Sequence, residues 1–330
     1  MKTKHILLAA AALTLLTACE KVSPIGVLVS GTAVEDRVKM SNLYYAKYLN
    51  DDDQIGVAED EYTFLVGSDS HITTDIGRLA EMFDIGLRDG DLFMAHLGDI
   101  ADTKAEYYIN LDSCVRQGRQ KYIDKYFIEN EDGTYTLKDN PDSEPIKPED
   151  LVFPFFPVVG NHDITHNGWA LWSNIFHSSF YEFDIAVLVN GTIEFDHFIF
   201  LDTASGTLGQ TQVDLINQGA LNGDNFYRHT FVFGHTNIFR PSQMEFASTF
   251  AREETFFLLN QFKKWNASIV FCGHVHKWDE RVFDGVTYLT LDSMSEANSP
   301  NPGDYLVRVH VKKDGTLTWE KVRMNYTAKK

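Results

Sequence analysis

The stretch FPFFPVVGNHD, residues 153–163, combines the two signals around which this chain is organised. Its apolar first part, residues 153–159, is typical of a buried strand, and the tetrapeptide GNHD then places an amide, an imidazole and a carboxylate side by side. Similar polar clusters occur elsewhere in the chain: Asp69-Ser70-His71, Gly98-Asp99-Ile100-Ala101-Asp102, Gly234-His235 and Gly273-His274-Val275-His276. We therefore predict that these separate stretches converge on one metal site.

A strand–helix–strand pattern precedes this stretch. Residues 62–67 and 91–97 are β-rich, and apolar residues between 74 and 87 recur at helical spacing. Such a unit indicates two neighbouring parallel strands. In parallel sheets, ligand-binding residues gather beyond the carboxyl ends of the strands. Asp69 and Asp99 come just after these two strands, so we expect both at that edge of the sheet.

The rest of the chain continues as strands and helices. Helices are expected at 104–127, 171–176, 212–221 and 255–265, and strands at 197–202, 228–233 and 268–272. Short runs at 282–283, 286–291, 305–311 and 317–322 are interpreted as antiparallel strands, with a hairpin turn at Asp314-Gly315. Residues 103–150 depart from their surroundings, and we interpret them as an insertion that contains a helix, a hairpin-like excursion and a loop.

The residue types in the clusters favour divalent or trivalent metals. Two Asp, one Asn and four His suit ions such as Zn, Mn, Fe or Co, and the absence of cysteine ligands argues against a closed structural zinc site. Seven ligands are too many for one such ion, but two ions that share a bridging carboxylate would use them all. Two ions about 3.5–4 Å apart can bridge a water, lower its pKa and stabilise an in-line displacement at phosphorus.

In this order, the motifs DxH, GDxxD, GNHD, GH and GHxH resemble the calcineurin-like metallophosphoesterase superfamily, over residues 60–295. The resemblance implies an α/β fold, a four-layer α/β/β/α sandwich with mixed sheets. It also implies hydrolysis of a small phosphate ester by in-line attack of a hydroxide that bridges two metal ions. By position, Asp69, His71 and His276 would hold the first ion, Asn161, His235 and His274 the second, and Asp99 would bridge the two.

The resemblance also implies roles outside the metal ligands. His162 would stabilise the transition state or protonate the leaving oxygen, and Asp102 would support His162 or its loop. Asp163 would be a supporting partner behind the ligands. Purple acid phosphatases, one branch of the superfamily, have a tyrosine where this chain has Asp102, so their iron–tyrosinate chemistry is not expected here. His166 and Trp169 follow GNHD closely and are further candidates for the substrate side.

The N-terminus has the pattern of an export signal. Two lysines precede an apolar run over residues 6–16, which is shorter than the roughly 20 residues of a membrane span. The run ends at Leu16-Thr17-Ala18-Cys19, which resembles the bacterial lipobox, in which the cysteine becomes the lipidated first residue. The alternative is an ordinary cleavable signal with a coincidental cysteine.

The lipobox resemblance sets our expectation for the domains. We expect a lipoprotein signal peptide at 1–18, a tether and N-terminal segment at 19–58 with one short helix near residues 44–48, and the metallophosphoesterase domain at 59–330. The protein would then be exported and lipid-anchored through Cys19 to a bacterial membrane, at the outer membrane or the cell surface.

Composition narrows the partners. The chain has 330 residues and a formal net charge of −18, which argues against a nucleic acid polymer, since such partners need a basic face. Cys114 and Cys272 form no disulfide framework. Two alternatives stay open beside a phosphomonoesterase: a phosphodiesterase, and a surface lipoprotein that keeps the fold as a binding module without turnover. The complete set of candidate ligands argues against the second.

Overall fold

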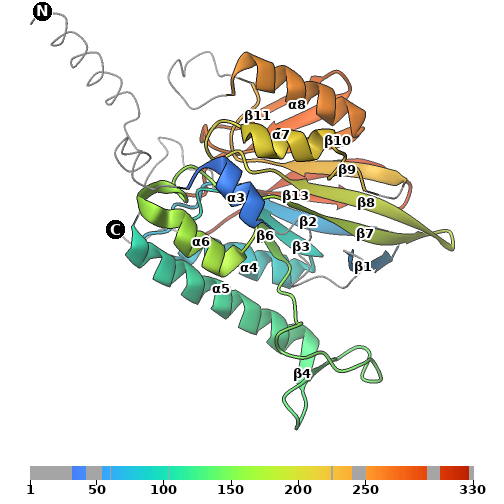
Figure 1. The fold of residues 1–330 in the computed structure, drawn as a ribbon. Coiled ribbons are helices and arrows are strands. Elements are labelled where there is room, and N and C mark those ends of the chain that lie inside the picture. The colour runs from blue at the N-terminus through green and yellow to red at the C-terminus, as the bar shows by residue number, and fades with distance from the viewer. Residues whose placement is uncertain are drawn as a thin grey trace, which may run out of the picture.

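Two β-sheets pack face to face, and helices cover the outer face of each sheet (Figure 1). The computed structural model describes residues 32–41, 54–59, 61–102, 104–223, 226–239, 250–295 and 305–326, with the backbone alone over 54–59. Both sheets contain parallel and antiparallel pairs. The predicted fold class, an α/β/β/α sandwich with mixed sheets, is therefore confirmed.

The smaller sheet has five strands in the order β14-β13-β2-β3-β6. As the strand–helix–strand pattern predicts, β2 (Tyr62–Gly67) is parallel to β3 (Phe93–His96), which is parallel to β6 (Phe155–Pro157). β13 (Tyr305–Val311) runs antiparallel to β2 and to β14 (Leu317–Arg323). The turn predicted between these last two strands contains Gly315 at a φ of +79°, a conformation that glycine adopts without steric cost.

The larger sheet has seven strands in the order β1-β7-β8-β9-β10-β12-β11. Along the chain these are β1 (Gln54–Glu59), β7 (Tyr181–Val189), β8 (Thr192–Phe200), β9 (Tyr227–Phe233), β10 (Ala267–Cys272), β11 (Asp279–Phe283) and β12 (Val286–Thr290). β8, β9, β10 and β12 form three parallel pairs. The antiparallel pairing expected at 286–291 is present between β11 and β12, but β12 also lies beside β10 in the same direction, because the chain turns back after the edge strand β11.

The interface between the sheets is a core rich in phenylalanine. Phe64 stacks on Phe93 with ring centres 4.8 Å apart, and Phe200 stacks on Phe233 at 4.5 Å. Each buried ring contributes about 1.5–3 kcal/mol by leaving water, and an aromatic pair adds about 0.5–1.5 kcal/mol. This packing fixes the two sheets against each other, and with them the loops that follow their strands.

Two helical layers complete the sandwich (Figure 1). The smaller sheet is covered by α4 (Gly77–Asp89), α5 (Ala105–Tyr126) and α6 (Gly168–Phe176), the last preceded by the short 3-10 helix η1 (Thr165–Asn167). The larger sheet is covered by α3 (Val34–Met40), α7 (Gly209–Asn217) and α8 (Arg252–Lys264). Among the described residues, no helix combines the length and the apolar character needed to cross a bilayer.

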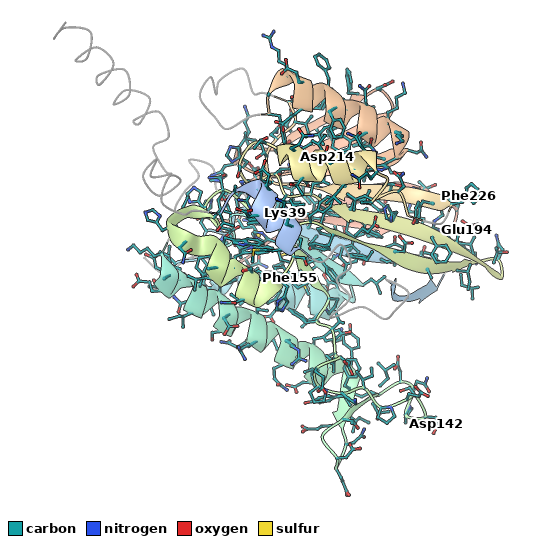
Figure 2. All side chains as sticks on the ribbon, viewed as in Figure 1. Lys39, Asp142, Phe155, Glu194, Asp214 and Phe226 are labelled. Atoms are coloured by element: carbon teal, nitrogen blue, oxygen red, sulfur yellow. The ribbon has the colours of Figure 1, made fainter. Side chains whose placement is uncertain are left out.

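The segment 103–150 is partly integrated into the domain. Tyr108, Leu111 and Cys114 of α5 are buried in the core under the helices of the smaller sheet. Beyond α5, β4 (Phe127–Glu129) and β5 (Tyr135–Leu137) form a hairpin, and the loop with Asp142 follows; both project from the body (Figures 1 and 2). The helix and the hairpin-like excursion expected here are thus present, and the helix packs on the domain.

β7 and the hairpin that it forms with β8 were not predicted from the sequence. Asn190 and Gly191 join the two strands with φ values of +50° and +83°, and nine residue pairs align across them. An Asn-Gly pair between two β-rich runs is the sequence signal for such a turn, because both positions need a left-handed φ. The helix expected near residues 44–48 lies outside the described residues, whereas α3, which was not expected, precedes it.

Candidate metal centre

The predicted clusters meet at one edge of the sandwich, where strands of both sheets end. In the smaller sheet β2, β3 and β6 are parallel, and in the larger sheet β9 and β10 are parallel. The carboxyl ends of parallel strands lie at a common edge, which is where such sheets hold ligands. Every candidate follows one of these ends: Asp69 and His71 after β2, Asp99 after β3, Asn161 and His162 after β6, His235 after β9, and His274 and His276 after β10.

One group of side chains that could hold a metal ion consists of Asp69, His71, Asp99 and His276, whose ligand atoms lie within 4.8 Å of one another. His276 Nε2 is 3.2 Å from His71 Nε2 and 3.2 Å from Asp69 Oδ1. His71 Nε2 lies 3.9 Å from Asp99 Oδ2. Two imidazole nitrogens that face each other at this distance need a proton or a cation between them, so the group is arranged around positive charge.

A second group consists of Asp99, His235 and His274, and the amide of Asn161 joins it. Asn161 Oδ1 is 2.8 Å from both His235 Nε2 and His274 Nδ1, and these two nitrogens are 3.2 Å apart. Asp99 Oδ2 lies 3.5 Å from His235 Nε2. Metal–nitrogen bonds of about 2.0–2.1 Å at octahedral to tetrahedral angles would separate neighbouring ligand atoms by about 2.9–3.4 Å. The observed separations, 2.8–3.5 Å, extend 0.1 Å beyond this range at either end and are close to those around a metal ion, and Asp99 belongs to both groups.

The charge states in the two groups also suit metal ligands. Burial lowers the pKa of His71 and the pKa of His274 to about 4, so both imidazoles are neutral at pH 7. For Asp69 and Asp99 burial alone would raise the pKa, but nearby histidines, above all His276 and His235 respectively, hold both pKa values below the usual range. Among the described residues, neither carboxylate pairs with a lysine or arginine. Neutral imidazoles and ionised carboxylates are the forms that bind metals.

The backbone at the centre is strained. Positive φ angles between 42° and 70° occur at Asp69, His71, Asp99, His274 and His276. Such conformations cost about 1–3 kcal/mol each and gather at functional sites, where the surrounding structure enforces them. Gly160 shows how closely two of the loops approach, because a Cβ added there would lie 2.1 Å from the backbone nitrogen of Asp99. Only glycine leaves room for this contact.

Hydrogen bonds to the far side of the candidate ligands fix which atom of each side chain faces the centre. Asp99 Oδ1 accepts the backbone N–H of His162 at 2.7 Å, which leaves Oδ2 toward the two groups. His235 Nδ1 donates to the carbonyl oxygen of Leu97 at 2.7 Å, so its Nε2 points to Asn161. Asp69 Oδ2 accepts the backbone N–H of His274 at 3.1 Å. Partners of this kind fix the tautomer and orientation of metal ligands.

Asp163, the last residue of GNHD, joins the loop after β3 to the loop after β6. Its fully buried carboxylate accepts backbone N–H groups from Gly160 at 2.8 Å, Ile100 at 3.1 Å and Ala101 at 3.2 Å. Tyr108 of α5 donates to the backbone oxygen of Asp163 at 2.9 Å. Burial and the nearby Asp99 carboxylate raise the pKa of Asp163 to about 7. Asp163 thus occupies a supporting position behind the ligands.

His162 lies beside both groups and is held by Asp102. Its Nδ1 is 3.0 Å from Asp102 Oδ1, and its Nε2 is 4.0 Å from Asp99 Oδ2. Burial lowers the pKa of His162, but the carboxylates of Asp99 and Asp102 outweigh this and raise the pKa to about 9. The ring is nearly perpendicular to that of His71, with centres 4.6 Å apart. Because Asp102 engages Nδ1, Nε2 is the nitrogen directed toward the centre.

The two further candidates for the substrate side differ from each other. His166 is exposed, with a φ of +52°. Trp169 is only 2% exposed and stacks on Trp172 with ring centres 5.4 Å apart. Trp169 is therefore a core residue, and of these two candidates His166 is the one that reaches solvent.

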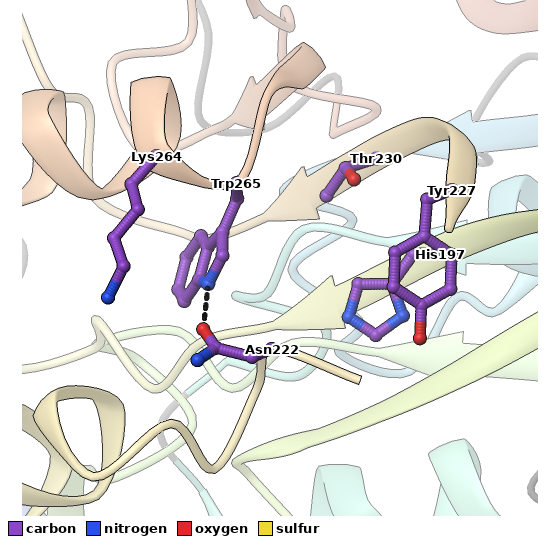
Figure 3. A pocket seen from close by; sticks show the side chains of 6 residues that line it. All are labelled: His197, Asn222, Tyr227, Thr230, Lys264 and Trp265. Atoms are coloured by element: carbon purple, nitrogen blue, oxygen red, sulfur yellow. Dashed lines mark hydrogen bonds between the residues drawn. The ribbon is translucent and has the colours of Figure 1, made fainter. Parts of the chain in front are cut away.

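A cavity of about 220 Å³ lies at the other end of the larger sheet (Figure 3). It is lined by His197, Asn222, Tyr227, Thr230, Lys264 and Trp265. Tyr227 begins β9, whereas His235 follows its end, so the length of a strand separates the cavity from the metal centre. Within the cavity Trp265 Nε1 donates to Asn222 Oδ1 at 3.1 Å (Figure 3). The cavity is thus not part of the candidate metal centre.

The two-sheet sandwich and the Asp, Asn and His side chains gathered at its strand ends fit the class of metal-dependent phosphoesterases that the sequence motifs resemble. The model of one such family, calcineurin-like phosphoesterase, matches residues 62–278, and the chain belongs to this family. The match spans every candidate ligand. The family and the two ligand groups together support metal-dependent hydrolysis of a phosphoester. No curated protein matches the sequence.

Solved structures resemble this chain at low sequence identity. A dimetal phosphatase from Danio rerio is 12% identical with a TM-score of 0.49, and the alignment covers 79% of this chain and 95% of that one. An anchor protein of the inner membrane complex of Plasmodium is 14% identical with a TM-score of 0.46, over 81% of this chain and 90% of the other. A putative 5'-nucleotidase from Staphylococcus aureus is 12% identical with a TM-score of 0.41, over 81% and 55%. The likeness extends to the fold alone.

Proposed function

We propose that the protein hydrolyses a small phosphate ester with two metal ions, held by the residues that the family resemblance implies. The observation that carries this proposal is the position of Asp99. Its Oδ2 lies 3.9 Å from His71 Nε2 in one ligand group and 3.5 Å from His235 Nε2 in the other. One ion would be held by Asp69, His71 and His276 and the other by Asn161, His235 and His274, with Asp99 shared between them.

The mixture of carboxylate, amide and imidazole ligands suits Mn, Fe or Zn. When bound, the two ions would supply a hydroxide for in-line attack at phosphorus and neutralise the negative charge of the ester. The chain provides the rigid frame for this chemistry, because Leu97, Asp163 and the backbone N–H groups described above fix the orientation of the ligands.

His162 would handle the proton of the reaction. The Asp102 carboxylate favours the protonated ring by raising its pKa, and it holds Nδ1 so that Nε2 faces the centre. A protonated Nε2 can donate to the oxygen of the leaving group or to the charge that develops on the phosphoryl oxygens. General acid catalysis of this kind typically contributes about 10²–10⁴-fold in rate.

Metal analysis combined with hydrolysis assays tests the proposal. Protein lacking residues 1–19 would be stripped with a chelator, reloaded with Mn, Fe or Zn, and assayed on p-nitrophenyl phosphate and its diester analogue. We expect two ions per chain and turnover that depends on them, and the preferred ester separates a monoesterase from a diesterase. Absence of both metal binding and turnover with every ion would refute the proposal. Metal binding without turnover on either ester would favour the binding module.

We further propose that the chain is exported and anchored by lipid at Cys19, after removal of residues 1–18. Cys19 lies outside the described residues, so the support is the sequence: a positive start, a short apolar run, and small residues directly before the cysteine. Cells fed labelled palmitate should label the wild-type protein and not Cys19→Ala. An unlabelled wild-type protein that is still exported would show an ordinary cleavable signal instead.

A further inference from the structure

Arg37 of α3 is fully buried and forms a two-point ion pair with Asp202, which lies just beyond the end of β8. Arg37 Nε donates to Asp202 Oδ2 and Nη2 to Asp202 Oδ1, both at 2.8 Å. Nη1 also donates to the carbonyl oxygen of Thr32 at 2.8 Å, and Nη2 to Ser205 Oγ at 3.1 Å. The two partners are 165 residues apart in the chain, and Arg37 lies outside residues 62–278 that match the family.

Asp202 directly precedes Thr203, which holds the backbone of the candidate ligand His235. Thr203 Oγ1 accepts the backbone N–H groups of His235 at 2.7 Å and Thr236 at 3.0 Å. Thr236 Oγ1 in turn donates to the carbonyl oxygen of Thr203 at 2.5 Å. With Nδ1 of His235 held by Leu97, these bonds fix both the backbone and the ring of that histidine. The position of His235 Nε2 therefore depends on where the chain runs at Asp202–Thr203.

We propose that Arg37 is a positioning residue of the metal centre. By holding the carboxylate of Asp202, whose backbone N–H and carbonyl are bonded by Gln212, it completes the frame of the Asp202–Thr203 backbone on which His235 rests, and so of the ligand group of Asn161, His235 and His274. The segment around α3 would then be a working part of the centre although it precedes the residues that match the family. The inference rests on the proposed function, since it assigns Arg37 a role in that same site.

Attachment of α3 alone does not account for the ion pair. Val34 and Val38 already pack α3 into the apolar core with Leu208 and Ile216, beside α7 (Figure 1). A buried ion pair is often no more stabilising than apolar side chains of the same volume, because both charges lose their hydration. What the pair supplies beyond packing is a fixed geometry, with two bonds from a planar guanidinium to one carboxylate. The ion pair imposes this geometry on Asp202, the residue directly before Thr203.

The test compares Arg37→Met with Arg228→Met. Arg228, near the start of β9, bonds the buried carboxylate of Asp196 at 3.0 Å and 2.5 Å, and the length of β9 separates it from His235. Each substitution removes the arginine partner of a fully buried carboxylate, so Arg228→Met controls for general destabilisation. The measurements are Mn²⁺ titration of the metal-free protein by calorimetry, the Mn²⁺ electron paramagnetic resonance spectrum, and the thermal midpoint.

We expect Arg37→Met to weaken one of the two Mn²⁺ sites by about 10–100-fold, the usual effect of losing a group that orients a ligand. Arg228→Met should lower the thermal midpoint but leave both affinities at the wild-type value. Wild-type affinities in Arg37→Met, or equal losses in both variants, would overturn the inference. If Arg37→Met does not fold, Thr203→Val and Thr203→Ser are measured instead. Thr203→Val should weaken the same Mn²⁺ site and Thr203→Ser should not. Any other result overturns the inference.

The outcome for the wild-type protein separates this inference from the proposed function. A wild-type chain that binds no Mn²⁺ would remove the proposed function, and this inference with it. Two ions bound by the wild type and equally well by Arg37→Met would remove only the role of Arg37.

Discussion

His197 provides a test of the electrostatics that does not depend on metal. It is buried between two carboxylates beside the cavity of Figure 3, with Nδ1 2.6 Å from Asp184 Oδ1 and Nε2 3.0 Å from Glu182 Oε2. The ring of Tyr227 stacks on it with centres 4.3 Å apart. Burial lowers the pKa of His197, but the bonds to Asp184 and Glu182 outweigh this and raise the pKa to about 9. The folded protein should therefore hold this proton more tightly than the unfolded chain.

The raised pKa of His197 sets the sign and the size of the pH dependence of stability. The pKa rises from its ordinary value of 6.5 to about 9, so the stabilisation is fully present below pH 6.5 and is lost as the pH rises through 9. One pKa unit corresponds to 1.36 kcal/mol, so the contribution of His197 to the free energy of unfolding should fall by about 3 kcal/mol between pH 6.5 and 9.5.

The pH dependence of the free energy of unfolding is measured by urea denaturation of the wild type and His197→Gln across this range. A chelator is present in both cases. Groups that titrate alike in both proteins cancel in the difference between the two free energies of unfolding. The variant should be less stable at pH 6.5, because Glu182 and Asp184 lose their cation, and the gap should narrow by about 3 kcal/mol toward pH 9.5. Parallel pH dependences in the two proteins would refute the reasoning.

Three further predictions concern the metal centre. His162→Gln should bind Mn²⁺ like the wild type but lower kcat by about 10²–10⁴-fold in steady-state assays with an aryl phosphate. Asp102→Asn should also keep Mn²⁺ and lower kcat by a smaller factor. Loss of metal in either variant would contradict the assignment of these residues to the reaction and not to the metal. Asp99→Asn should lose metal, measured by elemental analysis, together with turnover, and wild-type metal content would argue against a shared ligand. Gly160→Ala adds a Cβ 2.1 Å from Asp99 N, so it should lower the free energy of unfolding by about 1–3 kcal/mol and weaken Mn²⁺ binding in titrations; unchanged affinity would mean that the loops shift without disturbing the ligands.

The candidate site was predictable because its signals are local. Each ligand stands within a short motif directly after an apolar run, and the rule that parallel sheets bind ligands beyond their carboxyl ends brings such motifs together. Asp69 and Asp99 could be placed in this way from one strand–helix–strand unit. Which oxygen or nitrogen of each residue faces the centre could not, because that depends on distant partners such as the carbonyl of Leu97, which bonds His235.

The parts that the sequence did not reveal depend on contacts between distant segments. The direction of β12 is set by its neighbour β10, which alternating apolar residues do not indicate. Arg37 and Asp202 carry no local pattern, because a single arginine in a polar segment is usually solvated. The Asn190-Gly191 turn is different, since the dipeptide is a recognised signal and only required attention to the β-rich runs on both sides.

The origin of the ligands in two sheets has a consequence for folding. Asp69, Asp99 and Asn161 follow strands of the smaller sheet, while the histidines at 235, 274 and 276 follow strands of the larger one. Neither ligand group is complete until the phenylalanine core joins the two sheets, because each group takes residues from both. Metal bound by the proposed ligands would therefore add to the free energy that holds the sheets together. The strained left-handed residues and the buried carboxylates oppose folding at this edge, and bound cations would offset that cost where it arises.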